Sequence, residues 1–367
     1  MSFRIAVSSS GKGRRFSPDK NFYNFHPQVH DALGIQTSKN FFDRKAHRPD
    51  SGEDAFFISK IGYDDNAFAF GVADGVGGWS ESGIDPADFS HAFCGHMAEA
   101  SLNWDSSPES LRAMSLMQLG YEKTLSDKAV FAGSSTACVG VTRSDGSVQL
   151  ANLGDSGSLL FRLAAVHHYS APQTHDFNTP YQLAAVPELI RRQSSLFGGR
   201  QFEDLPQDAA ITNCSLQHGD VLVLATDGVF DNLNNQEVLK LVTTRMMGSG
   251  AWTGTSDMGI SATDNLDPLT KPGGLSFGSK RTKPQRAVAG SEETDLQGKG
   301  HTLQALLAVT IAGEAKIASM DFRRDGPFAK EYQRHRPWDH YRGGKPDDIT
   351  VVVLVAVEEG RSTSASS

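Results

Sequence analysis

Apolar residues fall in short runs along much of the chain, and most of these runs have the length of a β-strand. Runs of five to nine mainly apolar residues occupy 55–59, 67–73, 136–142, 147–153, 158–163, 221–225 and 349–357. Runs of this length that are bounded by glycine, aspartate or serine are typical of strands. Asp145-Gly146 separates two of the runs and predicts a hairpin turn.

Other segments have the three- or four-residue spacing of helices. Helices are expected to begin at Asp85-Pro86, at Ser107-Pro108, near 235 and near 302. Aspartate or serine before proline is a favourable helix start, and Leu111 is expected on the apolar face of the second helix. Strands and helices do not alternate regularly, so the pattern predicts an α+β fold with mostly antiparallel sheets covered by helices.

Three segments depart from this pattern. Residues 3–7 are predicted to form a short edge strand; the basic, serine-containing start of the chain is also similar to the tail of an organelle-targeting segment, although the strand is favoured. Residues 247–300 are rich in Gly, Ser, Thr and Lys and are predicted to be a flexible, low-complexity insertion. Residues 362–367 are expected to be a disordered tail.

Composition excludes several classes of protein. The chain has 367 residues, of which 38% are hydrophobic and 21% charged, as in globular proteins with a sizeable core. A net charge of −8 argues against a general nucleic-acid binder. No apolar run approaches the roughly 20 residues of a membrane helix, so no membrane span is expected. The three cysteines are predicted to be buried free thiols.

Acidic residues stand at the ends of several predicted strands. Asp74 follows the run 67–73, Asp227 follows 221–225, and Asp347-Asp348 directly precedes 349–357. Glycine follows the first two, which lets the backbone approach a bound ion. If the strands lie side by side, these acids converge, and their mutual repulsion would be relieved by divalent cations. The repeated arrangement therefore predicts one acidic, metal-binding mouth.

The candidate ligands are all hard oxygen donors, without a recurring His or Cys. This donor set favours Mg²⁺ or Mn²⁺ over zinc. Two such ions roughly 3.5–4 Å apart can activate water and polarise a phosphoryl oxygen.

Six motifs resemble, in the same order along the chain, the signatures of the metal-dependent type 2C protein phosphatases. They are Glu53-Asp54, the segments 72–75, 133–137, 152–156 and 225–231, and Asp347-Asp348-Ile349-Thr350. The segments 73–79, 177–183 and 341–348 are similar to the mitochondrial, PTC-seven-like branch of that family. The likeness runs from about residue 3 to 357 apart from the insertion.

The resemblance implies a four-layer α-β-β-α sandwich, with two mostly antiparallel sheets between helix pairs, in a single catalytic domain over 1–361. It also implies that Asp74 bridges two ions and that Asp227 and Asp347 complete the protein ligands of one. The carbonyl of Gly75 would bind the other ion, with Glu53 acting through water.

Further roles follow from the same resemblance. Asp54 is expected just outside the ligands, and Asp155 and Asp231, together with Asp227, are similar to a weaker third-ion site. Arg48 is a candidate phosphate-binding residue, one position from where relatives often carry arginine. Val76 stands where many relatives have a histidine suited to protonating the leaving group.

The activity implied is hydrolysis of phosphoserine and phosphothreonine in proteins by a hydroxide bridging two Mn²⁺ or Mg²⁺ ions, without a phosphoenzyme. One alternative is a catalytically weak pseudophosphatase that binds phosphoproteins, which predicts a missing ligand. Another is a different two-metal hydrolase such as a nuclease, which predicts a basic substrate track. The branch resemblance implies phosphoprotein substrates and a location in the mitochondrial matrix.

Overall fold

Strand β18 (Ile349–Val357) shows why the last apolar run of the chain has almost no polar position. All nine of its residues are buried. Val351 and Val353 pack toward helices α6 (Asn235–Gly248) and α8 (Leu303–Met320), whereas Val352 and Leu354 pack between the two sheets. Successive side chains of a strand point to opposite faces. A strand inside a layered molecule is covered on both faces, so both sets are apolar.

The computed structural model describes the chain except for residues 37–39, 189, 193–202, 276–300 and 360–367. Its described part contains two six-stranded sheets, and every pairing within them is antiparallel. The first sheet has the order β10 (Ala165–Tyr169), β9 (Gly157–Arg162), β15 (Val221–Ala225), β18, β1 (Ser2–Ser10) and β2 (Phe22–Phe25). The second has the order β14 (Ala210–Ser215), β8 (Ser147–Leu153), β7 (Ala137–Thr142), β5 (Asp64–Asp74), β4 (Asp54–Ile61) and β3 (Ala32–Leu33).

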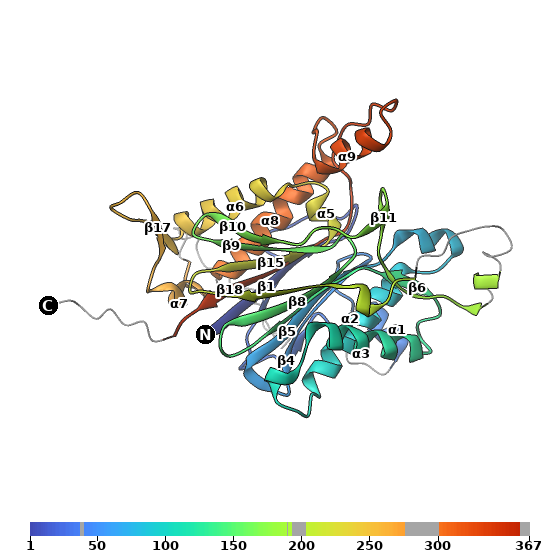
Figure 1. Cartoon of the computed structure of the whole chain (residues 1–367), viewed down its shortest axis with the longest axis horizontal. Coiled ribbons are helices and arrows are strands. Elements are labelled where there is room, and N and C mark those ends of the chain that lie inside the picture. The colour runs from blue at the N-terminus through green and yellow to red at the C-terminus, as the bar shows by residue number, and fades with distance from the viewer. Residues whose placement is uncertain (37–39, 189, 193–202, 276–300, 360–367) are drawn as a thin grey trace, which may run out of the picture.

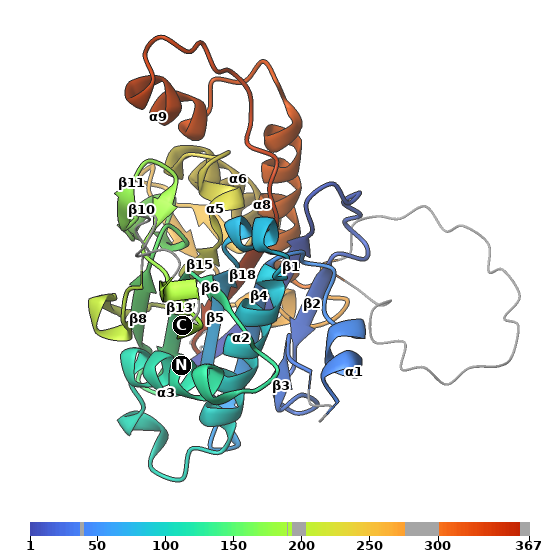
Figure 2. The same ribbon diagram turned by 90° about the vertical axis from the view of Figure 1, so that its right-hand side faces the viewer.

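Helices cover the outer face of each sheet, which confirms the predicted α+β sandwich (Figure 1). Helices α6 and α8 lie on the first sheet, and α2 (Pro86–Leu102) and α3 (Ala113–Ser126) lie on the second (Figure 2). Three apolar layers result, one under each helix pair and one between the sheets. Phe56, Phe70 and Leu354 belong to the layer between the sheets.

Helix α8 differs from the expectation that no apolar segment approaches the length of a membrane span. Its 18 residues have a mean hydropathy of 1.3, so length and composition would allow it to cross a membrane. In the structure most of the helix is buried against β1 and β18. Burial in the core of this fold therefore explains the apolar composition of α8.

Smaller elements connect the layers. Three short antiparallel pairs are β6 (Gly133–Ser135) with β13 (Leu183–Ala185), β11 (Thr174–Asp176) with β12 (Thr179–Pro180), and β16 (Trp252–Gly254) with β17 (Ile260–Ala262). The short helices are α1 (Phe41–Ala46), α5 (Asp227–Phe230), α7 (Leu266–Leu269) and α9 (Pro327–His335). The hairpin predicted at Asp145-Gly146 joins β7 and β8.

Two details of the predicted elements are wrong. Residues 3–7 do not form an edge strand, because β1 pairs with β18 on one side and with β2 on the other. The second helix does not begin at Ser107-Pro108, where one 3₁₀ turn forms, but at Ala113. Leu111 is buried although it precedes the helix.

The predicted loose insertion over 247–300 also differs from the structure in its first half. Residues 252–269 form β16, β17 and α7, and Trp252 and Leu266 are fully buried in the layer under α6 and α8. The indole nitrogen of Trp252 donates to the carbonyl of Gly219 at 3.0 Å. Two large apolar side chains are enough to tie a Gly- and Ser-rich segment to the core. Residues 276–300 and the tail 362–367 lie outside the described residues.

Candidate active site

The strand ends bring the predicted acids together at one edge of the two sheets. Asp74 is the last residue of β5, and Asp54, the first residue of β4, is its register partner. Asp227 begins α5 directly after β15, and Asp347 precedes β18, the neighbour of β15. Carboxylate oxygens of Asp74, Asp155 and Asp227 lie within 4.8 Å of one another. Three separate turns thus supply one carboxylate cluster.

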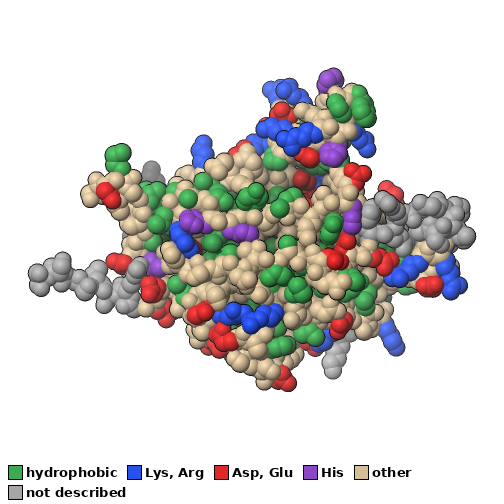
Figure 3. Space-filling view, in the orientation of Figure 1, with side chains coloured by type: hydrophobic (Ala, Val, Ile, Leu, Met, Phe, Trp, Pro, Cys, Tyr) green, Lys and Arg blue, Asp and Glu red, His purple; other side chains and the backbone are tan. Residues whose placement is uncertain are grey.

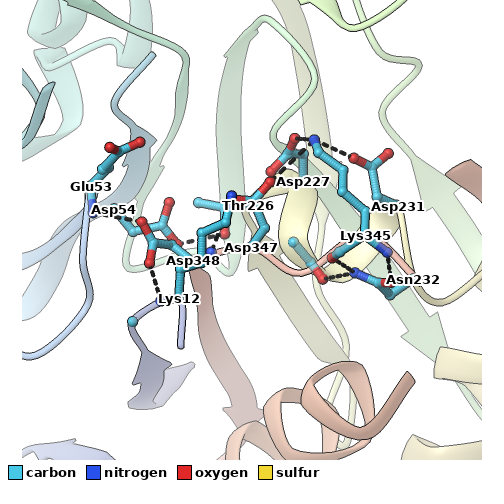
Figure 4. Close-up of polar contacts among 12 residues, drawn as sticks. Lys12, Glu53, Asp54, Thr226, Asp227, Asp231, Asn232, Lys345, Asp347 and Asp348 are labelled. Atoms are coloured by element: carbon cyan, nitrogen blue, oxygen red, sulfur yellow. Dashed lines mark hydrogen bonds and ion pairs between the residues drawn. The ribbon is translucent and has the colours of Figure 1, made fainter. Parts of the chain in front are cut away.

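Lys345 places an ammonium group within this cluster (Figure 4). Its Nζ lies 2.5 Å from Asp227 Oδ2, 2.7 Å from Asp231 Oδ2 and 3.2 Å from Asp347 Oδ2. Asn232 fixes the lysine backbone, since its side chain accepts from the Lys345 N–H at 2.9 Å and donates to the Lys345 carbonyl at 2.9 Å. Sequence reasoning gave this lysine no role. Its only signal was its place between two glycines and the Pro-Asp-Asp that opens β18.

Charge and burial shift the pKa values of the residues in the cluster in different directions. Burial and the charges of Asp227 and Asp54 raise the pKa of Asp74 well above its ordinary value. Burial alone would also raise the pKa of Asp227, but the Lys345 ammonium lowers it below the ordinary value. Burial would lower the pKa of Lys345, yet the charges of Asp227, Asp231 and Asp347 raise it further above its usual range. The cluster thus carries more negative charge than one ammonium neutralises.

Asp348 positions the acidic turn that precedes β4. One of its oxygens accepts from the backbone N–H of Glu53 at 2.7 Å, and the other accepts from the backbone N–H of Lys12. Gly52 allows this contact, because it has φ of +72° and a Cβ there would lie 2.0 Å from Asp348 Oδ1. Asp348 therefore holds two loops beside the cluster with its side chain.

Glu53 lies beside the cluster with its carboxylate near Gly77. A Cβ on Gly77 would be 2.9 Å from Glu53 Oε2. Burial, followed by the charges of Asp348 and Asp347, raises the pKa of Glu53 to about 7. A pKa this high means that nearby positive charge does not offset the negative charge of the carboxylate, as expected for a group that faces other acids.

Gly75 lies against the backbone on two sides. A Cβ at this position would be 2.8 Å from both the Glu53 carbonyl and the Pro86 carbonyl. The Gly75 N–H donates to the Glu53 carbonyl at 3.2 Å. Only glycine fits the close approach between β5, the turn before β4 and the start of α2.

Asp54 is buried behind these groups. Its Oδ2 accepts from Thr226 Oγ1 at 2.8 Å, and Thr226 Oγ1 in turn accepts from the Thr350 N–H at 3.1 Å. Burial and the charge of Asp348 raise the pKa of Asp54 well above its ordinary value. These bonds tie β4 to β15 and β18, so Asp54 connects the two sheets at the site.

The donor set fits hard divalent cations. Asp155 Oδ1 is buried and has no hydrogen-bond partner in the described part of the chain, so one oxygen of the cluster is left for another ligand. The groups that converge are carboxylates, which are ligands that Mg²⁺ and Mn²⁺ accept. Crowded acids with raised pKa values are the electrostatic condition that a bound cation relieves.

Arg48 forms ion pairs with two acids at the N-terminus of α2. Its guanidinium is 2.6 Å from Asp88 Oδ1 and 3.6 Å from Asp85 Oδ2, and its side chain is 13% exposed. Phosphate binding by Arg48 would require exchange of these ion pairs. The role stays a prediction.

The comparisons with known proteins decide the family. Residues 44–258 match the family model described as protein phosphatase 2C. The chain belongs to the protein phosphatase 2C family. The matched segment contains Glu53, Asp74, Asp155 and Asp227, and Asp347 lies beyond it. This phosphatase is accordingly a metal-dependent hydrolase that acts on phosphorylated serine and threonine in proteins.

Relatives of the phosphatase cover most of its length. The protein named "Protein phosphatase 2C homolog 7, mitochondrial" from Saccharomyces cerevisiae is 31% identical over 95% of this chain and 85% of its own. "Protein phosphatase PTC7 homolog fig" from Drosophila willistoni is 33% identical over 84% of this chain and 78% of its own. The X-ray structure of the photosystem II phosphatase PBCP has a TM-score of 0.57 at 23% identity, covering 86% of this chain and 94% of that one. This last likeness supports the fold.

Proposed function

We propose that this phosphatase hydrolyses phosphoserine and phosphothreonine monoesters by direct attack of water on phosphorus, without a phosphoenzyme. The observation that carries the proposal is the convergence of Asp74, Asp155 and Asp227 from three separate turns to within 4.8 Å. Two divalent ions, Mn²⁺ or Mg²⁺, would supply an activated water there and offset the charge of the substrate phosphate.

The chain's own residues would divide the work of holding these ions. Asp74 would bridge both, and Asp227 and Asp347 would complete the protein ligands of one. The Gly75 carbonyl would bind the other, with Glu53 acting through water. Asp54 would orient the strand ends from behind, as its bond to Thr226 supports.

A third, weaker ion would be held by Asp155, Asp227 and Asp231. Oδ1 of Asp155, which has no hydrogen-bond partner among the described residues, supports this assignment. Lys345 opposes it, because its ammonium already lies between Asp227 and Asp231. The same ammonium lies 3.2 Å from Asp347 Oδ2, so it would also oppose an ion held by Asp227 and Asp347.

We also propose that this phosphatase acts on phosphoproteins of the mitochondrial matrix. Its residues 1–361 would form a single catalytic domain. The location is supported by the Saccharomyces cerevisiae relative, whose name describes it as mitochondrial.

The proposed activity is tested with a phosphothreonine peptide and purified protein in Mn²⁺. Hydrolysis is expected with Mn²⁺, and it should be lost with EDTA and in Asp74→Ala. Asp105→Ala is the matched control, because Asp105 is an exposed aspartate of a surface loop. Hydrolysis that persists in Asp74→Ala or in EDTA would contradict the proposal.

A further inference from the structure

A basic arm projects from the molecule beside the carboxylate cluster. The arm comprises residues 321–342, which connect α8 to the turn before β18 and include α9 (Figures 1 and 2). It has six Lys and Arg residues and four Asp and Glu residues, although the whole chain has a net charge of −8. Figure 3 shows Lys and Arg side chains gathered on this projection. The arm therefore has the opposite sign of charge to the protein that carries it.

Aromatic packing and backbone bonds fix the base of the arm next to the site. The Phe328 N–H donates to the Asp231 carbonyl at 3.0 Å, and Lys345 Nζ lies 5.3 Å from the centroid of the Phe328 ring. Tyr341 packs against Phe328 and Tyr332, with ring centroids 5.6 and 4.8 Å apart. A surface fixed in this way keeps a constant position relative to the carboxylates.

Most of the cations on the arm have no acidic partner among the residues that the structure describes. Arg324 pairs with Glu237, and Arg334 lies 2.7 Å from Glu331. Four other cations are exposed and have no ion pair within the described residues, namely Arg323, Lys330, Arg336 and Arg342. Unpaired cations on one projection attract an anionic partner and raise its rate of encounter.

Two exposed aromatic side chains accompany these cations. Trp338 is 79% exposed and Phe322 is 74% exposed. Arg323 lies over the Phe322 ring at 5.6 Å, and Arg336 lies over the Tyr332 ring at 5.5 Å. Aromatic and arginine side chains are the residue types that contribute most to protein recognition surfaces.

We propose that the arm docks an acidic segment of the substrate protein that flanks the phosphorylated residue. The inference rests on the proposed function and names its substrate class. The carboxylate cluster itself repels acidic peptides, so attraction for them has to come from a neighbouring surface. The arm meets this need because its base contacts Asp231 and Lys345 while its cations face solvent.

The test compares three phosphothreonine peptides that differ only in having acidic, neutral or basic flanks. We expect kcat/KM for the acidic peptide to exceed that for the basic peptide by about tenfold at low salt, with the ratio falling as NaCl rises to about 0.5 M. The triple charge reversal K330E/R336E/R342E should bring this ratio to one or below, and K330Q/R336Q/R342Q should give an intermediate ratio. Because each ratio is taken within one variant, a partly unfolded fraction does not change it.

The matched control is R112E/K123E/K128E, three exposed cations at and after α3 on the opposite helix layer. This control should keep the wild-type ratio, since it makes the same change in net charge far from the arm. Equal kcat/KM for the acidic and basic peptides in wild type would overturn the proposal while leaving the phosphatase activity intact.

A binding measurement separates failure of the docking proposal from failure of the proposed function. Fluorescence anisotropy of the labelled peptides in EDTA reports docking without hydrolysis. Tighter binding of the acidic peptide to wild type than to the charge-reversed arm would support docking even if no peptide were hydrolysed. Loss of binding to vesicles containing phosphatidylserine on arm reversal, without any change in peptide binding, would assign the arm to membranes and refute docking.

Discussion

Removing the ammonium group of Lys345 is expected to strengthen the binding of Mn²⁺. Lys345→Met keeps most of the length of the side chain and its contact with Phe328 but deletes the charge. In the structure this charge lies 2.5 Å from Asp227 Oδ2 and 3.2 Å from Asp347 Oδ2, two of the proposed ligands. An ion at these carboxylates therefore competes with the lysine for the same oxygens.

The magnitude follows from the charges involved. A divalent and a univalent cation about 4 Å apart repel each other by about 8 kcal/mol at an effective dielectric constant near 20, twice the value for two unit charges. Part of this repulsion is relieved when the lysine turns toward solvent, which leaves a gain of about 1.4–2.8 kcal/mol in the variant. This corresponds to a ten- to hundredfold lower Kd for Mn²⁺. In EDTA the variant should lose about 3 kcal/mol of unfolding free energy, because its buried carboxylates lose their counter-ion.

Titration calorimetry and the electron paramagnetic resonance signal of free Mn²⁺ measure the affinity, and urea unfolding in EDTA measures the stability. Lys12→Met is the matched control, because Lys12 Nζ is 3.7 Å from Asp347 Oδ1 but its side chain is 62% exposed. A change below about threefold is expected there. Unchanged or weaker Mn²⁺ binding in Lys345→Met would refute the competition.

Three further outcomes are expected. Asp74→Asn should lower kcat/KM on a phosphothreonine peptide by more than about 100-fold and reduce the number of bound Mn²⁺ ions, measured by equilibrium dialysis; an unchanged stoichiometry would argue against its bridging role. Burial and the charge of Arg48 lower the pKa of His91 to about 3, so the unfolded chain binds this proton first as the pH falls below about 6.5. The unfolding free energy of wild type should therefore fall by about 2 kcal/mol between pH 7 and 5, and that of His91→Gln should not show this fall. Urea unfolding that gives the same pH dependence for both proteins would disprove this. Trp252→Ala should cost about 3–5 kcal/mol in urea unfolding; a cost below about 1 kcal/mol would mean that residues 252–269 are not tied to the core.

The apolar runs predict the antiparallel strands and the position of the acids at their ends because both follow from strong local patterns. The four-layer sandwich was implied by the resemblance to the type 2C phosphatases. Run 221–225 is apolar throughout and run 349–357 is apolar except for Thr350, a pattern that indicates burial on both faces. An acid placed directly at the end of such a run can only lie at the edge of the sheet. Asp74 and Asp227 therefore come together once the strands are stacked, as the structure confirms.

The features that the sequence did not predict depend on contacts between distant segments. Lys345 is one lysine among many until the fold places it against Asp227 and Asp231, 118 and 114 positions away. Strand β1 is not at the edge of its sheet because it also pairs with β2, a strand of only four residues. Residues 252–269 have a composition typical of loops, and two buried side chains outweigh it. Tertiary contacts of this kind leave little trace in local composition or periodicity.

The most direct test of the acidic, ion-binding mouth is an anomalous difference map from crystals soaked in Mn²⁺. Two strong peaks that share Asp74 as a ligand are expected, one of them also within about 2.3 Å of Asp227 and Asp347 carboxylate oxygens. Strong peaks only elsewhere on the protein, with Asp74 free of metal, would contradict it.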